Sequence, residues 1–160
     1  IDMYNRYVKP TYLFKEERFI AKQDNSLPKC IICDIDGTLA LMNGRNPYDE
    51  SKISTDKVNG YVAKILKQYD NGDIIIFSGR KDSCKVDTIN WLELNEISYT
   101  DIHMRKHDDN RKDSIIKREL YDEFIKDKYY VEYILDDRDS VVRMWRDLGL
   151  LCLQVYYGDF

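Results

Sequence analysis

The feature that most constrains the fold is a continuous apolar run within residues 73–78, DIIIFS. A strand with one face in water alternates apolar and polar residues, so an unbroken run indicates a strand that is covered on both faces. Residues 30–34, CIICD, form a similar run. Further strands are predicted at about 97–103, 131–136 and 150–156.

Helical patterns lie between these strands, which predicts an α/β protein. Apolar residues recur at helical spacing from Val58 onward, with Thr55 or Asp56 as the N-cap and Gly72 beyond the end. A second apolar stripe covers residues 139–148. Strands that alternate with helices predict a central parallel sheet of about five strands with helices on both faces.

The composition is that of an ordinary globular domain. The 160 residues are 43% hydrophobic and 34% charged, and a net charge of −4 means that any site for a polyanion must be local. No apolar run approaches the roughly 20 residues that a bilayer-spanning helix needs. Residues 29–160 are predicted to form one domain, and residues 1–28 a linker or packing arm that ends in the turn-rich DNSLP. The chain starts at Ile1, so we expect a fragment of a longer protein.

Cys30 and Cys33 have the CxxC spacing of redox and zinc sites. Both lie inside an apolar run, however, and no second pair of ligands follows. The more economical interpretation is that they are small buried hydrophobic residues.

Acidic and polar residues follow the predicted strands at their carboxyl ends. Asp34 and Asp36 follow the first strand, Ser78 ends the second, and Asp136 and Asp137 end the fourth. In a parallel sheet these ends meet at one edge, where ligands bind. Carboxylates that lie this close repel one another unless a cation lies among them, and Mg²⁺ prefers hard oxygen ligands. The sequence therefore predicts a Mg²⁺ site at this edge.

Each of these signals has a simpler interpretation when it is taken alone. Asp136 and Asp137 could cap the next helix. Asp113 and Lys117, four residues apart on one face of a predicted helix, could form an exposed ion pair of small energetic weight. The order of the signals at successive strand ends favours a functional site.

The same motifs resemble those of a known superfamily. DIDGT at 34–38, IIIFSGR at 74–80, Lys117 and ILDD at 134–137 resemble, in order, the four motifs of the haloacid dehalogenase superfamily. More narrowly, the chain from Lys29 to Phe160 closely resembles the phosphatase domain of phage-type polynucleotide kinase-phosphatases. The segments that carry this resemblance are DIDGTLALMNGRNPYD, SGR, MRKHDDNRKDSIIK, LDDR, VVRMW and the terminal GDF.

The resemblance implies a Rossmann-like fold without a large cap domain. It places residues 1–28 at the junction with an upstream P-loop kinase domain. The chain itself contains no GxxxxGK[ST] element, so kinase activity is not expected from it. The resemblance also implies a location in the cytoplasm of a bacterium or of a phage-infected cell, away from membranes.

The resemblance further implies a role for each catalytic residue. Asp34 would be the nucleophile that forms an aspartyl-phosphate, and Asp36 the general acid and then the general base. Thr38, Ser78 and Lys117 would hold the phosphoryl oxygens.

Four further roles are implied in the same way. Asp113 would orient Lys117, and Arg45 and Arg80 would clamp the phosphate. Mg²⁺ would be held by Asp34, the backbone carbonyl of Asp36, and either Asp136 or Asp137.

The substrate that the resemblance implies is the 3′-phosphate or 2′,3′-cyclic phosphate end of RNA or DNA. The segments after the first and third predicted strands are too short for a large cap, which leaves the site open to a large molecule. Residues 103–118 carry six Lys or Arg against three Asp, and Arg105 and Lys112 are candidates for contacts with backbone phosphates. A solvated helix face is an equal explanation of this charge.

Two alternatives belong to other functional classes. One is a small-molecule phosphomonoesterase on the same fold, because fold does not fix substrate. The other is a non-catalytic module that binds nucleic-acid ends for a kinase partner. The intact pair of Asp34 and Asp36 favours an enzyme, since a binding module needs no nucleophile.

Overall fold

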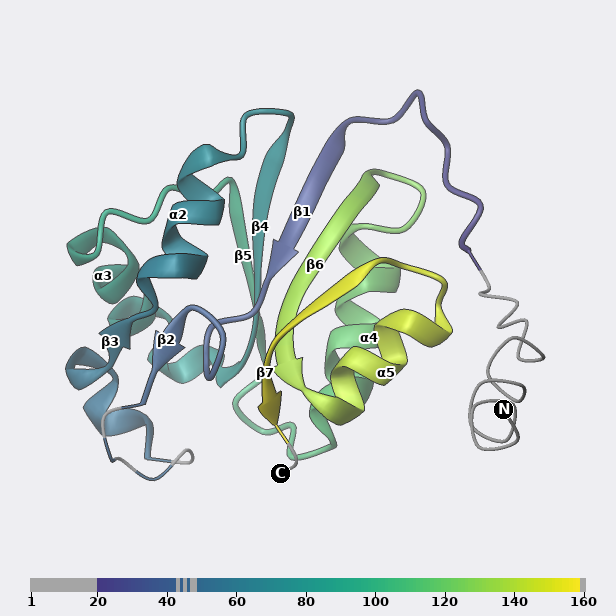
Figure 1. Cartoon of the computed structure of the whole chain (residues 1–160). Helices are drawn as coiled ribbons and strands as arrows, with labels where there is room; N and C mark the ends of the chain where they lie inside the picture. The colour runs from purple at the N-terminus through teal and green to yellow at the C-terminus, as the bar shows by residue number, and fades with distance from the viewer. Residues whose placement is uncertain (1–19, 43, 45, 47–48, 159–160) are drawn as a thin grey trace, which may run out of the picture.

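The structure, a computed structural model, describes residues 20–42, 44, 46 and 49–158. A sheet of five parallel strands in the order β5-β4-β1-β6-β7 forms its centre (Figure 1). The strands are β1 (Lys29–Cys33), β4 (Asp73–Lys81), β5 (Asp101–Arg105), β6 (Tyr130–Arg138) and β7 (Cys152–Gly158).

Among the described residues, four helices cover the two faces of this sheet. In Figure 1, α2 and α3 lie on one side of the strands and α4 and α5 on the other. Their bounds are α2 Gly60–Gln68, α3 Lys85–Leu94, α4 Asp113–Phe124 and α5 Asp139–Asp147. The predicted α/β architecture is confirmed.

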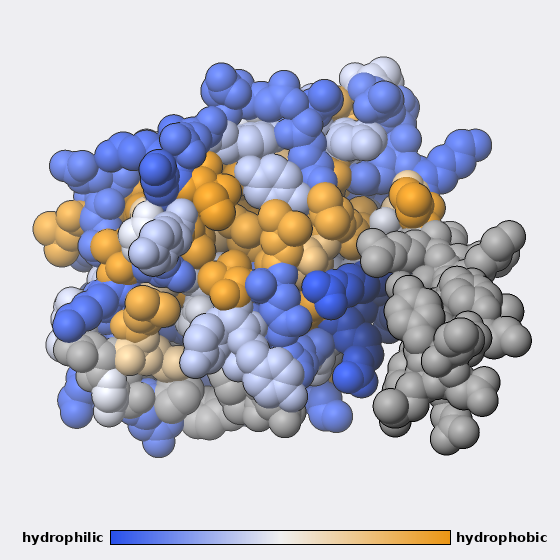
Figure 2. All heavy atoms as spheres, viewed as in Figure 1, coloured by the Kyte–Doolittle hydropathy of each residue, from blue (hydrophilic) through white to orange (hydrophobic). Residues whose placement is uncertain are grey.

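Apolar side chains on the two faces of each central strand build two separate cores. In β4, Ile74 and Ile76 belong to the core with α2 and α3, whereas Ile75 and Phe77 belong to the core with Trp145 of α5. This two-sided burial explains why the strand sequence is apolar without alternation. On the face seen in Figure 1, apolar residues gather between α2 and β6 and polar residues surround them (Figure 2).

Cys30 and Cys33 are both fully buried, but they point into different cores. Residues an odd number of positions apart on a strand point to opposite faces of the sheet, so these two thiols do not form one site. The interpretation as small buried hydrophobic residues holds.

The bounds of several elements differ from the prediction, and β4 and β6 extend to Lys81 and Arg138. Helix α2 begins after Asn59, whose side chain accepts from the Tyr61 N–H, and not at Thr55 or Asp56. Val58 belongs instead to a short strand. The predicted third strand, β5, begins at residue 101 and not at 97. Glu96 turns the chain at φ 55°, and the N–H of the buried Ile97 donates to the Leu92 carbonyl at the end of α3. The last strand runs from residue 152 to 158 rather than from 150 to 156.

The segment between β1 and α2 forms a small unit where a cap domain could be inserted. Strands β2 (Ala40–Leu41) and β3 (Lys57–Val58) pair in antiparallel fashion, and the 3₁₀ helix η1 (Glu50–Thr55) lies between them in the chain. A second 3₁₀ helix, η2 (Asp82–Cys84), precedes α3. Within the described residues, therefore, no large cap covers the carboxyl ends of the strands.

Residues 20–28 pack on the domain. The Gln23 side chain pairs with both the N–H (2.8 Å) and the carbonyl (3.0 Å) of Val131, and the Ala21 N–H donates to the Gly149 carbonyl. Residues 1–19 lie outside the described residues, so the assignment of residues 1–28 as a junction stays a prediction. No helix in the described part of the chain is both long enough and apolar enough to cross a membrane.

Candidate active site

The centre of the site is the buried ammonium group of Lys117 on α4. Lys117 is 1% exposed, and its Nζ lies 2.7 Å from Asp34 Oδ1 and 2.8 Å from Asp136 Oδ2. Asp113, one turn earlier on the same helix face, lies 3.9 Å from Nζ. Because Asp34 follows β1 and Asp136 lies in β6, one lysine joins a helix to two neighbouring strands. The structure thus brings two of the predicted strand-end aspartates together with the predicted Asp113–Lys117 pair of one helix face.

Three carboxylates of the site have the geometry to hold one metal ion. One oxygen from each of Asp34, Asp136 and Asp137 lies within 4.8 Å of the other two, and all three residues are buried. Burial raises the pKa of Asp34, and Asp136, Asp137 and Asp113 raise it further against the opposing effect of Lys117. Burial and the Asp136 charge also raise the pKa of Asp137 to about 6. A divalent cation with oxygen ligands would balance this excess of negative charge.

The charges on α4 are fixed by their neighbours. Burial disfavours the charged form of Lys117, but Asp136, Asp34 and Asp113 hold its pKa well above the usual value. Burial likewise opposes the ionised form of Asp113, but Lys117, Arg138 and Arg105 lower its pKa below the usual value. Lys117 is therefore a permanent cation and Asp113 a permanent anion near neutral pH.

Asp36 lies in a separate ion-pair network. Its two carboxylate oxygens accept from Nε (2.8 Å) and Nη2 (2.7 Å) of Arg80, and Nη2 also donates to Asp56 Oδ2 (2.9 Å). The side chains of Arg80 and Asp56 are 2% and 0% exposed. The Arg80 guanidinium thus binds the carboxylates of Asp36 and Asp56, and its predicted role as a phosphate clamp stays a prediction. The sequence pattern gave no functional signal for Asp56.

Two glycines allow the chain to pass close to the carboxylates. Gly37 has φ +84°, and a Cβ there would lie 2.7 Å from the Asp137 carboxyl carbon. A Cβ on Gly79 would lie 2.9 Å from the carboxyl carbon of Asp113. Both distances are too short for any side chain, so Gly37 allows the turn after β1 to approach β6, and Gly79 allows the end of β4 to approach the start of α4.

The remaining predicted residues lie around this centre. Thr38 and Ser78 are fully buried, and the Thr38 hydroxyl is 3.4 Å from Asp137 Oδ1. The regular pairing of β4 with β5 shifts register directly after Ser78, so the residue does end the regular part of the strand. Arg45, predicted to clamp the phosphate, lies outside the described residues.

The structure gives Arg105 a different setting from the one predicted. Its guanidinium donates to the backbone carbonyls of Gly79, Asp109 and Arg111 and to the carboxylate of Asp113. Its side chain is 12% exposed. Arg105 therefore staples the loop before α4 to β4 rather than extending toward solvent. Lys112, in contrast, is exposed.

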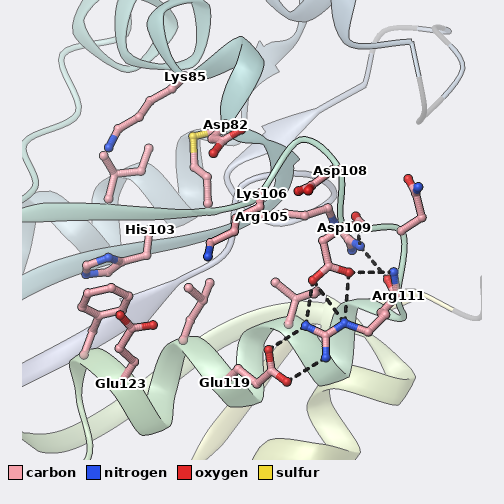
Figure 3. Close-up of a pocket in the computed structure, with 16 residues that line it drawn as sticks. Asp82, Lys85, His103, Arg105, Lys106, Asp108, Asp109, Arg111, Glu119 and Glu123 are labelled. Carbon is pink, nitrogen blue, oxygen red and sulfur yellow. Dashed lines mark hydrogen bonds and ion pairs between the residues drawn. The ribbon is translucent and has the colours of Figure 1, made fainter.

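A groove of about 900 Å³ lies beside the site, between β5 and α4 (Figure 3). Arg111 in this groove forms ion pairs with Asp109 and Glu119, each 2.7 Å long. The charged residues that line the groove are Asp82, Lys85, Arg105, Lys106, Asp108, Asp109, Arg111, Glu119 and Glu123. Five acidic residues nearly balance four basic ones, so the groove is not a basic patch of the kind that binds polyanions.

Comparison with known proteins agrees with this geometry. Residues 28–160 match the family model of the polynucleotide kinase PNKP phosphatase domain. The chain belongs to this family. A relative of this chain is the "putative bifunctional polynucleotide kinase/RNA ligase" of Autographa californica nuclear polyhedrosis virus. It is 36% identical over 131 residues, which cover 79% of this chain and 19% of the viral protein.

Two solved structures contain a chain similar to this PNKP phosphatase domain. They are described as the "Pnkp1/Rnl/Hen1 RNA repair complex" and the "Pnkp1/Rnl/Hen1 complex", and each match has 47% identity, a TM-score of 0.89 and 92% of this chain covered. The matches cover 49% and 52% of those chains, so the domain spans about half of their length.

The raised pKa of Asp137 predicts a specific dependence of stability on pH. Because the folded-state pKa of about 6 exceeds the usual 3.8, stability should fall as pH rises through this interval in the metal-free protein. Asp137→Asn should remove that loss and stabilise the protein by about 1–3 kcal/mol at pH 8, with little effect at pH 4. Urea unfolding in excess chelator measures the difference.

Asp147→Asn on the exposed surface of α5 is the matched control, and it should change stability little at either pH. An Asp137→Asn variant that is no more stable than the wild type at pH 8 would show that Asp137 ionises without penalty.

Proposed function

We propose that this domain is a polynucleotide 3′-phosphatase that removes 3′-phosphate and 2′,3′-cyclic phosphate from nucleic-acid ends during RNA repair. The observation that carries the proposal is the Lys117 ammonium held between Asp34 and Asp136, with Asp36 two residues beyond the nucleophile. The family membership and the RNA repair complexes among its relatives support it. The proposal includes fusion to a P-loop kinase domain in the full protein and a cytoplasmic location.

For a 3′-phosphate the chemistry takes two steps, and a 2′,3′-cyclic phosphate needs a second such cycle because it has two ester bonds. Asp34 attacks phosphorus and forms an aspartyl-phosphate as the bond from phosphorus to the 3′ oxygen breaks. Asp36 gives a proton to that oxygen and later takes one from the water that hydrolyses the intermediate. Lys117 neutralises charge on the phosphoryl oxygens and on Asp34, while Asp113 keeps Lys117 in place.

The site residues fit a magnesium ion, which would supply charge neutralisation for the phosphoryl group. Asp34 and the backbone carbonyl of Asp36 would hold it together with Asp137. Asp137 is favoured over Asp136 because each Asp136 oxygen already accepts a hydrogen bond of 3.0 Å or shorter. Oδ2 accepts from Lys117, and Oδ1 accepts from the Asp137 N–H at 3.0 Å.

The open strand ends suit a substrate larger than a metabolite. In the described residues only β2, β3 and η1 stand where a cap would enclose a small molecule. A terminal phosphate on a polynucleotide could therefore reach Asp34 while the rest of the strand stays outside.

We expect Mg²⁺-dependent release of phosphate from 3′-phosphorylated oligonucleotides, and loss of it in excess chelator. Asp34→Asn should lower kcat by at least about 10³-fold, because an amide cannot accept the phosphoryl group. Asp147→Asn, a surface change on α5, should leave turnover unchanged. Phosphate release from matched RNA and DNA substrates measures both effects.

Three other outcomes would contradict parts of this proposal. Full activity in excess chelator would exclude a role for the metal ion in turnover. Turnover of sugar phosphates without activity on 3′ ends would indicate a small-molecule phosphomonoesterase. Tight binding of phosphorylated ends without turnover would indicate a non-catalytic module.

Arg105 and Lys112 should respond differently to substitution. Lys112→Ala should lower kcat/KM for an oligonucleotide by about 3–10-fold at low salt, less at high salt, and not for an aryl phosphate, since a backbone contact is screened by salt. Arg105→Ala should lower kcat/KM for both substrates by a similar factor. The substitution removes the contacts that hold the loop before α4 and deprives Asp113 of a hydrogen-bond donor. Kinetics across a salt series measure this, and equal losses on both substrates for Lys112→Ala would exclude a contact with the strand.

A further inference from the structure

The Asp36 carboxylate pairs with the Arg80 guanidinium, which also pairs with Asp56. Nε and Nη2 of Arg80 grip the two oxygens of Asp36 at 2.8 Å and 2.7 Å, while Nη2 also reaches Asp56 Oδ2 at 2.9 Å. A planar guanidinium presents its donors in a fixed fork, so the angle of the fork sets the direction of the Asp36 carboxylate.

Asp56 is itself anchored away from the strand ends. Its backbone N–H donates to the Ile53 carbonyl at 3.0 Å, and its carbonyl accepts from Trp91 Nε1 at 2.9 Å. Thr88 Oγ1, also on α3, lies 3.4 Å from Arg80 Nη1. The orientation of Arg80 is thus fixed by Asp56, which follows η1, and by Thr88 of α3.

We infer that Asp56 is a positioning residue that acts through Arg80 to aim Asp36 for proton transfer. The inference rests on the proposed phosphatase function, because it assigns Asp56 to that reaction. Asp36 alone is 28% exposed in its side chain, so without the fork its carboxylate could turn toward water. Asp56 restrains the Arg80 guanidinium and thereby limits the rotation of the Asp36 carboxylate. Its own side chain is 0% exposed, so it acts without contacting the substrate.

The inference makes a distinctive kinetic prediction because Asp36 protonates the leaving oxygen. In the first step the Asp34–phosphorus bond forms, the bond from phosphorus to the leaving oxygen breaks, and the Asp36 proton moves to that oxygen. A weakly basic leaving group departs without this proton, whereas a strongly basic one depends on it. A misoriented Asp36 should therefore lower kcat/KM most for substrates with strongly basic leaving groups.

The experiment uses substituted phenyl phosphates of graded leaving-group basicity and the slope of log kcat/KM against leaving-group pKa. Asp56→Ala should steepen the slope, with a loss of about 10–100-fold for the most basic leaving group and much less for nitrophenol. Asp56→Asn should show a smaller change in the same direction, because the amide oxygen still accepts from Arg80 but no charge holds it. Asp36→Asn sets the limit of the effect.

Two further variants keep the test decisive if Asp56→Ala folds poorly. Arg80→Lys retains the charge without the fork and should reproduce the steeper slope, and adding Asp56→Asn to it should cost little more. Val131→Ala, a matched control near the start of β6 in the core on the other face of the sheet, should lower stability but keep the wild-type slope.

If folded Asp56 variants lower kcat/KM for all substrates by one common factor, or leave the slope unchanged, the inference is overturned and Asp56 is a structural residue. Failure of the wild-type protein to hydrolyse any phenyl phosphate or 3′-phosphorylated end would instead overturn the proposed function itself. The two failures are therefore distinguishable.

Discussion

The structure depends on one buried cation. A lysine ammonium without partners would not stay charged at 1% exposure, and the attraction of Asp34 and Asp136 offsets the cost of its burial. The same contacts tie α4 to the ends of β1 and β6, so the position of the helix and the charge state of the nucleophile are set together. Replacement of this lysine would leave several buried carboxylates without their common partner.

The two aspartates of the DIDGT turn have different surroundings, although only one residue separates them. Asp34 pairs with Lys117 from α4, on one side of the sheet, whereas Asp36 pairs with Arg80 from β4, backed by Asp56. Ile35 between them is fully buried and fixes the turn in the core. Separate cations allow one carboxylate to serve as nucleophile and the other to exchange protons, which is how neighbouring acids take distinct roles.

Local patterns predicted the parts of the molecule that depend on local physics. Two-sided burial of β1 and β4 follows from their unbroken apolar runs, and the spacing of Asp113 and Lys117 places both on one helix face. Contacts between distant segments were not predictable in this way. Asp56 was interpreted as a helix cap because nothing near it in the sequence shows that its partners are Arg80 and Trp91. Arg105 was counted as free positive charge for the same reason, although carbonyls and Asp113 surround it.

The central claim is that Asp34 accepts the phosphoryl group within the cluster around Lys117. The most direct measurement is a crystal structure of the protein with Mg²⁺ and beryllium fluoride, a mimic of an acyl-phosphate. The account predicts beryllium bonded to a carboxylate oxygen of Asp34, with a fluoride beside Lys117 Nζ. An adduct on Asp36 or Asp136, or a fluoride complex that contacts neither Asp34 nor Lys117, would contradict it.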